Sequence, residues 1–204
     1  SVHRKKIARP GAIGKHPGST GTRKTNMETG EPLALPLVAL MAKSGGEIEA
    51  LLPRLVQRFG AVFAASDDYD FDKYSAYYAP EFGTGLVKRI VFFGPLREQV
   101  LLVDDKCWTC ALEREIGSAE KRLVNIDPGF LNLSKLVLAS TKDHAHRIYL
   151  SRGIHAEVTL FYRAGSFQTS AWTYPDYRDQ IPFLNSVRNR LRTAFPEADP
   201  MRYR

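Results

Sequence analysis

A short segment near the middle of the chain brings together several groups that take part in chemistry. Residues 140–144 read Ser-Thr-Lys-Asp-His, which places a hydroxyl, an ammonium, a carboxylate and an imidazole within five positions. An ammonium beside hydroxyl groups suits a phosphate or a carboxylate. Thr141, Lys142 and Asp143 are therefore candidate ligand-binding residues. His144 is a candidate catalytic residue, because histidine titrates near neutral pH.

The following stretch predicts a β-hairpin closed by a three-residue loop at 151–153, with glycine in its last position. This register pairs Arg147 with Glu157 and Tyr149 with His155, and it places all four on one polar face. We expect Arg147 and Tyr149 to bind a ligand and His155 and Glu157 to be catalytic. The alternative is a solvated sheet face with a weak cross-strand ion pair.

The hairpin also contains a pattern that resembles a metal site. His144-x-His146 and His155-x-Glu157 are ligand types for zinc, iron or manganese. The predicted register puts the two pairs on opposite faces, so we assign no metal site. That assignment changes only if the first strand begins after His146 and the loop before it folds back.

Asp127 ends a predicted strand and begins the sequence Asp127-Pro128-Gly129, which favours a turn. A carboxylate at a strand end also suits a general base or an anchor for a metal-bound water. Asp127 is therefore a candidate catalytic residue, with a role in the turn as the alternative.

Two further lysines and two aromatic residues are candidates for ligand contact. Lys106 shares a predicted helix face with Thr109 and Glu113. The alternative for such lysines is simple exposure to solvent. Aromatic rings beside a proline could stack on a base or a sugar, or could cap the core. The additional ligand-binding candidates are Lys106, Lys135, Trp172 and Tyr174.

The positive charge is concentrated at the start of the chain. Residues 1–32 hold seven Lys and Arg against two Glu, a net of +5 out of the chain's +7. We expect a disordered basic tail that contacts polyanions nonspecifically, followed by a single α+β domain at 33–204. No apolar run approaches the roughly 20 residues that span a bilayer, and no apolar signal core follows the basic start. We therefore expect no membrane contact and a cytoplasmic location.

Hydrophobic periodicity predicts the order strand, helix, strand, strand, helix, strand. This order favours an α+β fold, a ferredoxin-like βαββαβ antiparallel sheet, extended by the hairpin and a C-terminal helix. Cys107 and Cys110 fall in the middle of the second helix, where half-buried thiols are expected rather than redox chemistry. The predicted strands are 35–42, 61–66, 86–94 and 122–129, and the predicted helices are 44–60, 98–118 and 183–195.

Four stretches carry a resemblance to a known family: YYAPEFGTGLVKRIVFF, RLVNIDPGFLNLSKLVLASTKDHAHRIYL, GIHAEVTLFY and WTYPDYR. Over about residues 35–190 the chain resembles an uncharacterised prokaryotic family, the domain of unknown function 4416. The resemblance implies a soluble prokaryotic protein without an established activity, and it transfers no catalytic residues. Some members are labelled GTP-binding proteins. The residues argue against that label, because the chain has no phosphate loop and Thr141-Lys142-Asp143 places Asp one position too early for guanine recognition.

Two functions stay open. The first is binding of, or action on, a small anionic ligand, phosphorylated or nucleotide-like, by the mixed-charge cluster at 140–157. The second is a nucleic-acid or ribonucleoprotein binding module that uses the basic tail and the C-terminal helix with Arg188, Arg190 and Arg192. The sequence does not decide whether the protein is an enzyme, which cofactor it uses or how it oligomerises.

Overall fold

The computed structural model describes residues 31–117 and 122–196. The predicted basic tail thus lies, except for its last two residues, outside the described residues. The described part has an α+β fold with one large antiparallel sheet and several helices. The strands are β1 (Leu33–Ala42), β2 (Ala61–Ala65), β3 (Tyr69–Asp70), β4 (Val87–Gly94), β5 (Arg97–Glu98), β6 (Asn125–Leu131), β7 (Lys135–Ser140), β8 (Ile148–Ser151), β9 (Ile154–Arg163) and β10 (Ser166–Thr169). The helices are α1 (Gly45–Phe59), α2 (Ala79–Phe82), η1 (Gln99–Leu101), α3 (Leu102–Ile116), α4 (Pro175–Asp179) and α5 (Ile181–Ala194).

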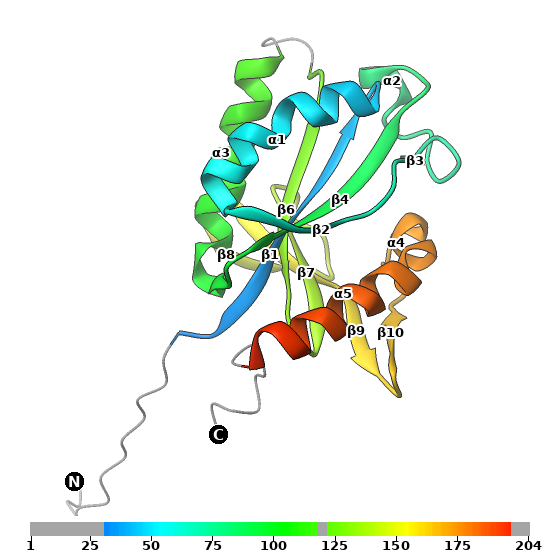
Figure 1. The fold of residues 1–204 in the computed structure, drawn as a ribbon. Coiled ribbons are helices and arrows are strands. Elements are labelled where there is room, and N and C mark those ends of the chain that lie inside the picture. Colours follow the sequence, from blue (N-terminus) through cyan, green and yellow to red (C-terminus); the bar gives the residue numbers. More distant parts are fainter. Residues whose placement is uncertain (1–30, 118–121, 197–204) are drawn as a thin grey trace, which may run out of the picture.

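Strand β1 lies inside the sheet, whose order is β10-β9-β7-β6-β1-β4-β2. Its side chains alternate between two cores. Val38 and Leu40 pack with α1 and α3, whereas Leu37 and Ala39 pack with α5 on the other face. Helices therefore cover both faces (Figure 1), which explains why β1 is an almost continuous apolar run.

Helix α1 begins where the sequence predicts it. Ser44 accepts a hydrogen bond from the backbone of Glu47, and the Glu47 carboxylate accepts one from the backbone of Ser44, a capping box that satisfies two free backbone donors. Its apolar face packs on the sheet, and the chain reverses at Gly60, whose φ is 100°. The buried residues of this face are Ile48, Leu51, Leu55 and Phe59.

The predicted turn at Asp127-Pro128-Gly129 is wrong, because these residues continue strand β6. Strand β6 pairs with β1 along its whole length, from Asn125 to Leu131, but with β7 only from Gly129 onward. The first half of β6 therefore has an open edge on the side of β7. Because backbone groups alternate between the two neighbours of a strand, Pro128 faces this open edge and needs no N–H there.

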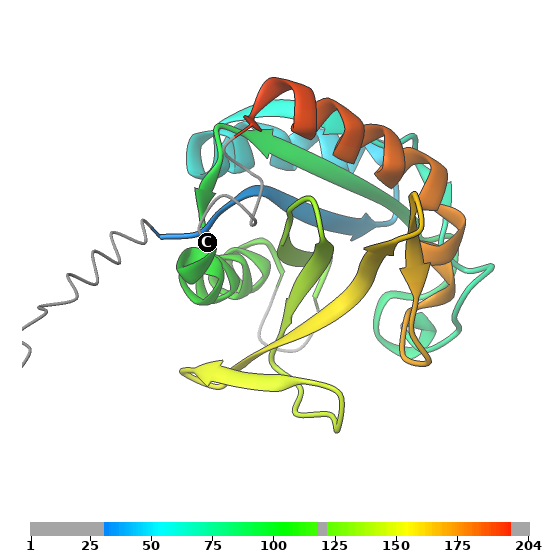
Figure 2. The same cartoon turned by 90° about the horizontal axis from the view of Figure 1, so that it is seen from below.

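The β8–β9 hairpin has the predicted pairs Ile148 with Ala156 and Tyr149 with His155. Its turn is shorter than predicted. Ser151, rather than Leu150, pairs with Ile154, and the two-residue turn has φ of 52° at Arg152 and 74° at Gly153. Positive φ at both positions is the geometry that two-residue hairpins prefer. The hairpin extends past the sheet on the side of α3 (Figure 2). The register of the hairpin shifts between Tyr149 and Ser151, at Leu150.

The polar face of this hairpin is buried on β9 but not on β8. Glu157 and Thr159 are buried, whereas all of β8 is exposed. The predicted solvated face is therefore wrong for β9. The pairing of β7 with β9 shifts between Val158 and Leu160, so Leu160 joins the core beneath α5 while Val158 packs toward α3. A bulge of this kind adds one residue and reverses the alternation of the faces beyond it.

Helix α5 covers the lower face of the sheet in Figure 1 with an apolar stripe. Its basic residues are partly engaged in packing. Arg188 donates to the carbonyl of Leu133 at 2.7 Å, and Arg190 donates to the carbonyl of Phe63 at 3.0 Å. No helix among the described residues is long and apolar enough to cross a membrane.

Candidate functional site

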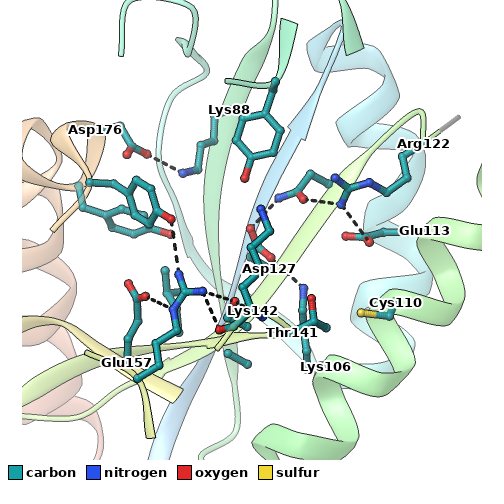
Figure 3. A pocket seen from close by; sticks show the side chains of 18 of the residues that line it. Lys88, Lys106, Cys110, Glu113, Arg122, Asp127, Thr141, Lys142, Glu157 and Asp176 are labelled. Carbon is teal, nitrogen blue, oxygen red and sulfur yellow. Dashed lines mark hydrogen bonds and ion pairs between the residues drawn. The ribbon is translucent and has the colours of Figure 1, made fainter. Parts of the chain in front are cut away.

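A charged cavity of about 130 Å³ opens where β6 and β7 separate (Figure 3). The lining comes from β4, α3, β6, β9, α4 and the segment after β7. Five cationic and four acidic side chains contribute to it, so charges of both signs meet in one small space. They are Lys88, Lys106, Arg122, Lys142 and Arg147, with Glu113, Asp127, Glu157 and Asp176.

Lys106 enters the cavity from α3 and contacts the open edge of β6. Its Nζ donates to Asp127 Oδ1 at 2.8 Å and to the carbonyl of Ile126 at 3.3 Å, while Asn125 Nδ2 donates to Asp127 Oδ2 at 2.6 Å. Burial alone would raise the pKa of Asp127. The Lys106 ammonium and the Asn125 amide outweigh burial and lower the pKa. Asp127 is thus held as a carboxylate at neutral pH.

Glu113 completes the open edge. Its Oε1 accepts a hydrogen bond from the backbone N–H of Ile126 at 2.5 Å. Lys106 and Glu113 lie on the same face of α3. Together they satisfy the backbone C=O and N–H of Ile126, which β7 would otherwise pair. Burial raises the pKa of Glu113. Burial also raises the pKa of Cys110, whose thiol lines the same wall, so this cysteine is not an activated thiolate.

Arg122 closes the cavity beside Asn125. It forms a two-point ion pair with Glu81, at 2.5 and 2.7 Å, and donates to Asn125 Oδ1 at 3.1 Å. Its guanidinium also lies 3.7 Å from Glu113. Arg122 therefore links the α2 segment to the network around Asp127.

A second ion pair is buried on the side formed by β4 and α4. Lys88 Nζ lies 2.6 Å from Asp176 Oδ2, and Tyr69 donates to the same oxygen at 3.0 Å. The ammonium also lies over the rings of Phe71, at 5.0 Å, and Tyr177, at 4.6 Å. Asp176 Oδ1 and the Tyr177 hydroxyl are buried and have no hydrogen-bond partner among the described residues.

Arg147 organises the segment that follows β7. Its Nε donates to Glu157 at 2.7 Å, and its Nη1 donates to Ser140 Oγ at 2.7 Å and to the carbonyl of Lys142 at 3.0 Å. Its Nη2 reaches the Tyr174 hydroxyl at 3.5 Å. The predicted partners Arg147 and Glu157 thus form a buried ion pair rather than a solvent-exposed one.

Lys142 lies at the mouth of the cavity, next to Thr141. Its Nζ donates to the Tyr77 hydroxyl at 2.7 Å and lies 4.6 Å from the centre of that ring. Among the cations of the lining, within the described residues, it is the one that lacks a carboxylate within ion-pair distance. The charge of Lys142 is therefore the most available to a ligand.

The predicted separation of His146 from Glu157 is wrong. Their side chains approach to 3.3 Å, because β8 begins only at Ile148 and His146 lies in the preceding turn, where strand alternation does not apply. The His146 ring stacks on Trp172 at 5.5 Å and on His144 at 5.9 Å. Trp172 donates to the carbonyl of Val158 at 3.0 Å, so this aromatic stack covers β9 outside the cavity lining.

His155 is buried outside the cavity lining, against Tyr149 at 5.3 Å. Its Nε2 lies 3.5 Å from Asp143, and its Nδ1 has no hydrogen-bond partner among the described residues. Within residues 31–117 and 122–196, no group of three or more His, Cys, Asp or Glu is arranged to hold a metal ion. His155 and Asp143 thus form a separate pair beside the site.

The structure divides the sequence candidates into two groups. Lys135 lies at the opposite end of β7 from Ser140 and does not line the cavity. Five other candidates lie in or near the hairpin and do not line the cavity. They are Asp143, His144, Tyr149, His155 and Trp172. The candidates that do meet in the lining are Lys106, Asp127, Thr141, Lys142, Arg147, Glu157 and Tyr174.

Sequence reasoning missed several residues of the lining that carry charge or hydrogen-bonding groups, among them Lys88, Arg122, Asp176 and Tyr177. Lys88 interrupts the apolar strand LVKRIVFF, and a buried lysine in a strand was a signal that was available. Asp176 and Tyr177 lie in the segment WTYPDYR, whose aromatic residues were a signal, although only Trp172 and Tyr174 are candidates from the sequence. Arg122 gave no signal, since it precedes β6 without a recognisable pattern.

The model of one protein family, "Domain of unknown function (DUF4416)", matches residues 31–191 of this sequence. The chain belongs to the DUF4416 family. No curated protein and no solved structure matches it. The family match spans every residue of the cavity lining, so the site lies within the family domain.

Proposed function

We propose that this DUF4416 protein binds a small anionic ligand, phosphorylated or carboxylated, in the cavity between β6 and β7. The observation that carries the proposal is the position of exposed Lys142 in the lining, in sequence beside Thr141 and near Ser140, with Arg147 donating to its carbonyl. An ammonium without a carboxylate partner, next to hydroxyl donors, is suited to an oxyanion. Of the mixed-charge cluster at 140–157, the proposal thus uses Ser140, Thr141, Lys142, Arg147 and Glu157, which line the cavity.

The other charges of the lining favour a small ligand over an extended polyanion. Lys88, Lys106 and Arg147 each already face a carboxylate within 2.8 Å. They make the cavity polar without giving it a large positive charge. A phosphate backbone is bound through many free cations, whereas a single anionic group needs only one or two.

The proposal is tested by calorimetric titration of the full chain with inorganic phosphate. We expect Lys142→Met to weaken binding about tenfold or more, because a hydrogen bond to a charged group contributes roughly 1.5–3 kcal/mol. Lys135→Met is the matched control, since Lys135 lies at the end of β7 that is remote from Lys142, and outside the lining. Equal losses in both variants, or no binding by the unaltered chain, would contradict the proposal.

Catalysis is a further step that the same cavity would allow. Asp127 and Glu157 are two of the four carboxylates that line it, and this supports them as candidates to act on a bound ligand. His144 and His155 lie outside the lining and would need the hairpin to move before they could transfer a proton. We therefore place the acid–base candidates at Asp127 and Glu157.

The nucleic-acid alternative has less support. Arg188 of α5 is buried and donates to the carbonyl of Leu133, so it does not contribute to a basic surface. Arg190 and Arg192 are exposed, and two arginines make only a small basic surface. The basic segment 1–30 lies outside the described residues, and its contact with polyanions stays a prediction.

Two broader expectations remain proposals. A ferredoxin-like core is supported by the order β6-β1-β4-β2, by antiparallel pairing throughout, and by the packing of α1 and α3 on one face. A cytoplasmic location is consistent with two unpaired cysteines, Cys107 and Cys110, in α3.

A further inference from the structure

We propose that the anion bound in the cavity belongs to a small phosphorylated hydroxy compound, whose hydroxyl groups meet Asp176 Oδ1 and the Tyr177 hydroxyl. This inference rests on the anion-binding function proposed above and narrows its ligand. Asp176 and Tyr177 lie side by side on α4 and line the same cavity as Lys142. In Figure 3 the pair of Lys88 and Asp176 lies on one side of the cavity and Thr141 and Lys142 on another.

The first step concerns hydrogen bonding. Asp176 and Tyr177 are each 1% exposed, yet Asp176 Oδ1 and the Tyr177 hydroxyl have no hydrogen-bond partner among the described residues. A buried polar atom without a partner costs roughly 1–3 kcal/mol, so native structures retain few of them. Two such atoms in neighbouring residues on one cavity wall indicate that they receive partners from what the cavity binds.

The second step concerns which partner fits. A carboxylate oxygen only accepts hydrogen bonds, so Asp176 Oδ1 requires a donor. Burial raises the pKa of Tyr177 well above its ordinary value, so its hydroxyl stays protonated and can also donate. A ligand hydroxyl both donates and accepts, and it therefore satisfies either atom.

The third step concerns charge. A ligand amine would also donate to Asp176, but it would enter as an ammonium. Lys88 Nζ already lies 2.6 Å from Asp176 Oδ2 and 4.6 Å from the centre of the Tyr177 ring. A second cation at this place would be repelled by the first. The neighbourhood of Lys88 therefore selects an uncharged donor, which is a hydroxyl group.

The fourth step concerns size. A cavity of about 150 Å³ in another protein holds one benzene molecule, which has six heavy atoms. The present cavity measures about 130 Å³. It accommodates a phosphate with a short hydroxylated chain, partly at its mouth, and it cannot enclose a whole nucleotide. The sequence left phosphorylated and nucleotide-like ligands open. The volume of the cavity favours a small hydroxylated phosphate ester among them.

The experiment compares two phosphate esters that differ in their hydroxyls. Calorimetric titration of the full chain uses glycerol 3-phosphate and n-propyl phosphate. We expect glycerol 3-phosphate to bind about tenfold more tightly, since one hydrogen bond to a buried charged group changes affinity by about that factor. Tyr177→Phe should reduce this preference severalfold and leave the affinity for n-propyl phosphate unchanged.

The controls separate recognition from folding. The Tyr177 hydroxyl has no partner within the described residues, so Tyr177→Phe should keep the thermal midpoint of the unaltered chain. Tyr162→Phe removes a tyrosine hydroxyl outside the lining and should keep the preference for glycerol 3-phosphate.

Three outcomes would overturn the inference in distinguishable ways. Equal affinity of the unaltered chain for the two esters would refute hydroxyl recognition and leave anion binding intact. Equal weakening of both esters by Tyr177→Phe would show that the hydroxyl acts only through packing. Binding of neither ester and of no inorganic phosphate would refute anion binding itself, and the inference with it.

Discussion

At the scale of single residues, some side chains of the cavity form an ion pair and also hydrogen-bond a backbone group. Lys106 is 4% exposed and donates at once to Asp127 and to the carbonyl of Ile126. Burial would lower the pKa of Lys106, but Asp127 and Glu113 outweigh it and raise the pKa. The lysine is therefore an ammonium whose loss would leave both a carboxylate and a carbonyl unpaired.

We predict that Lys106→Met destabilises the protein by about 2–4 kcal/mol at pH 7, because removal of one partner of a buried ion pair strands the other. The measurement is the free energy of unfolding in urea. Arg54→Met removes the solvent-exposed pair with Glu115 and should change the stability little. Equal stability of Lys106→Met and the unaltered chain would contradict this role of Lys106.

The same pair predicts a dependence on pH. The pKa of Asp127 is lowered in the folded state, so its stabilising contribution is complete above the unfolded value of about 3.9 and is lost as the pH falls toward the folded value. The difference in unfolding free energy between the unaltered chain and Lys106→Met should therefore shrink below about pH 4. A difference that stays constant from pH 7 to pH 3 would exclude Asp127 as the partner responsible.

At the scale of elements, the site exists because two neighbouring strands pair along only part of their length. Strands β6 and β7 pair from Gly129 to Leu131 and then separate toward Asp127 and Ser140. Side chains of α3 replace β7 at the open edge. The cavity is thus a consequence of where the ladder ends, and the ladder ends next to Gly129.

We predict that Gly129→Ala disrupts this junction. A Cβ at this position would lie 2.2 Å from the carbonyl oxygen of Val137, a backbone atom that cannot move without breaking the ladder. The expected loss of stability is several kcal/mol, of the order of a severe packing defect, with weaker phosphate binding in calorimetry. Gly46→Ala, in the first turn of α1, is the control and should be neutral or slightly stabilising, because only an ordinary contact is formed.

At the scale of the whole molecule, helices cover both faces of the sheet, and the cavity is a place between them where several buried charges gather. The net charge of residues 33–204 is only +2, since residues 1–32 contribute +5 of the +7. Nonspecific attraction to polyanions and specific binding of a small anion should therefore belong to different parts of the chain.

We predict that a chain starting at residue 33 loses most of its affinity for a single-stranded oligonucleotide but keeps its affinity for inorganic phosphate. Fluorescence anisotropy at increasing salt measures the first property, and calorimetry measures the second. Oligonucleotide binding that survives the truncation and still falls steeply with salt would instead support a nucleic-acid surface on the folded part.

The sequence by itself determined the elements with strong local signals. The capping box at Ser44, the apolar stripe of α1 and the apolar run of β1 each follow from neighbouring residues, and so do the cross-strand pairs of Tyr149 with His155. It also determined the family. Helical spacing alone placed Lys106, Thr109 and Glu113 on one face, and all three are buried.

Apart from the pair of Arg147 with Glu157, which the hairpin register predicted, only the tertiary structure decided which charges meet. Lys88 and Asp176 are 88 residues apart in sequence, and Lys106 and Asp127 are 21 apart. Local patterns do not record pairs of such separation. Asp127-Pro128-Gly129 favours a turn by itself, yet pairing with β1 keeps it extended, because a full ladder of hydrogen bonds outweighs a local preference. The physical reason is the same for the site as for the fold. A cavity is formed where distant strands stop pairing, and that end point is set by contacts across the sheet.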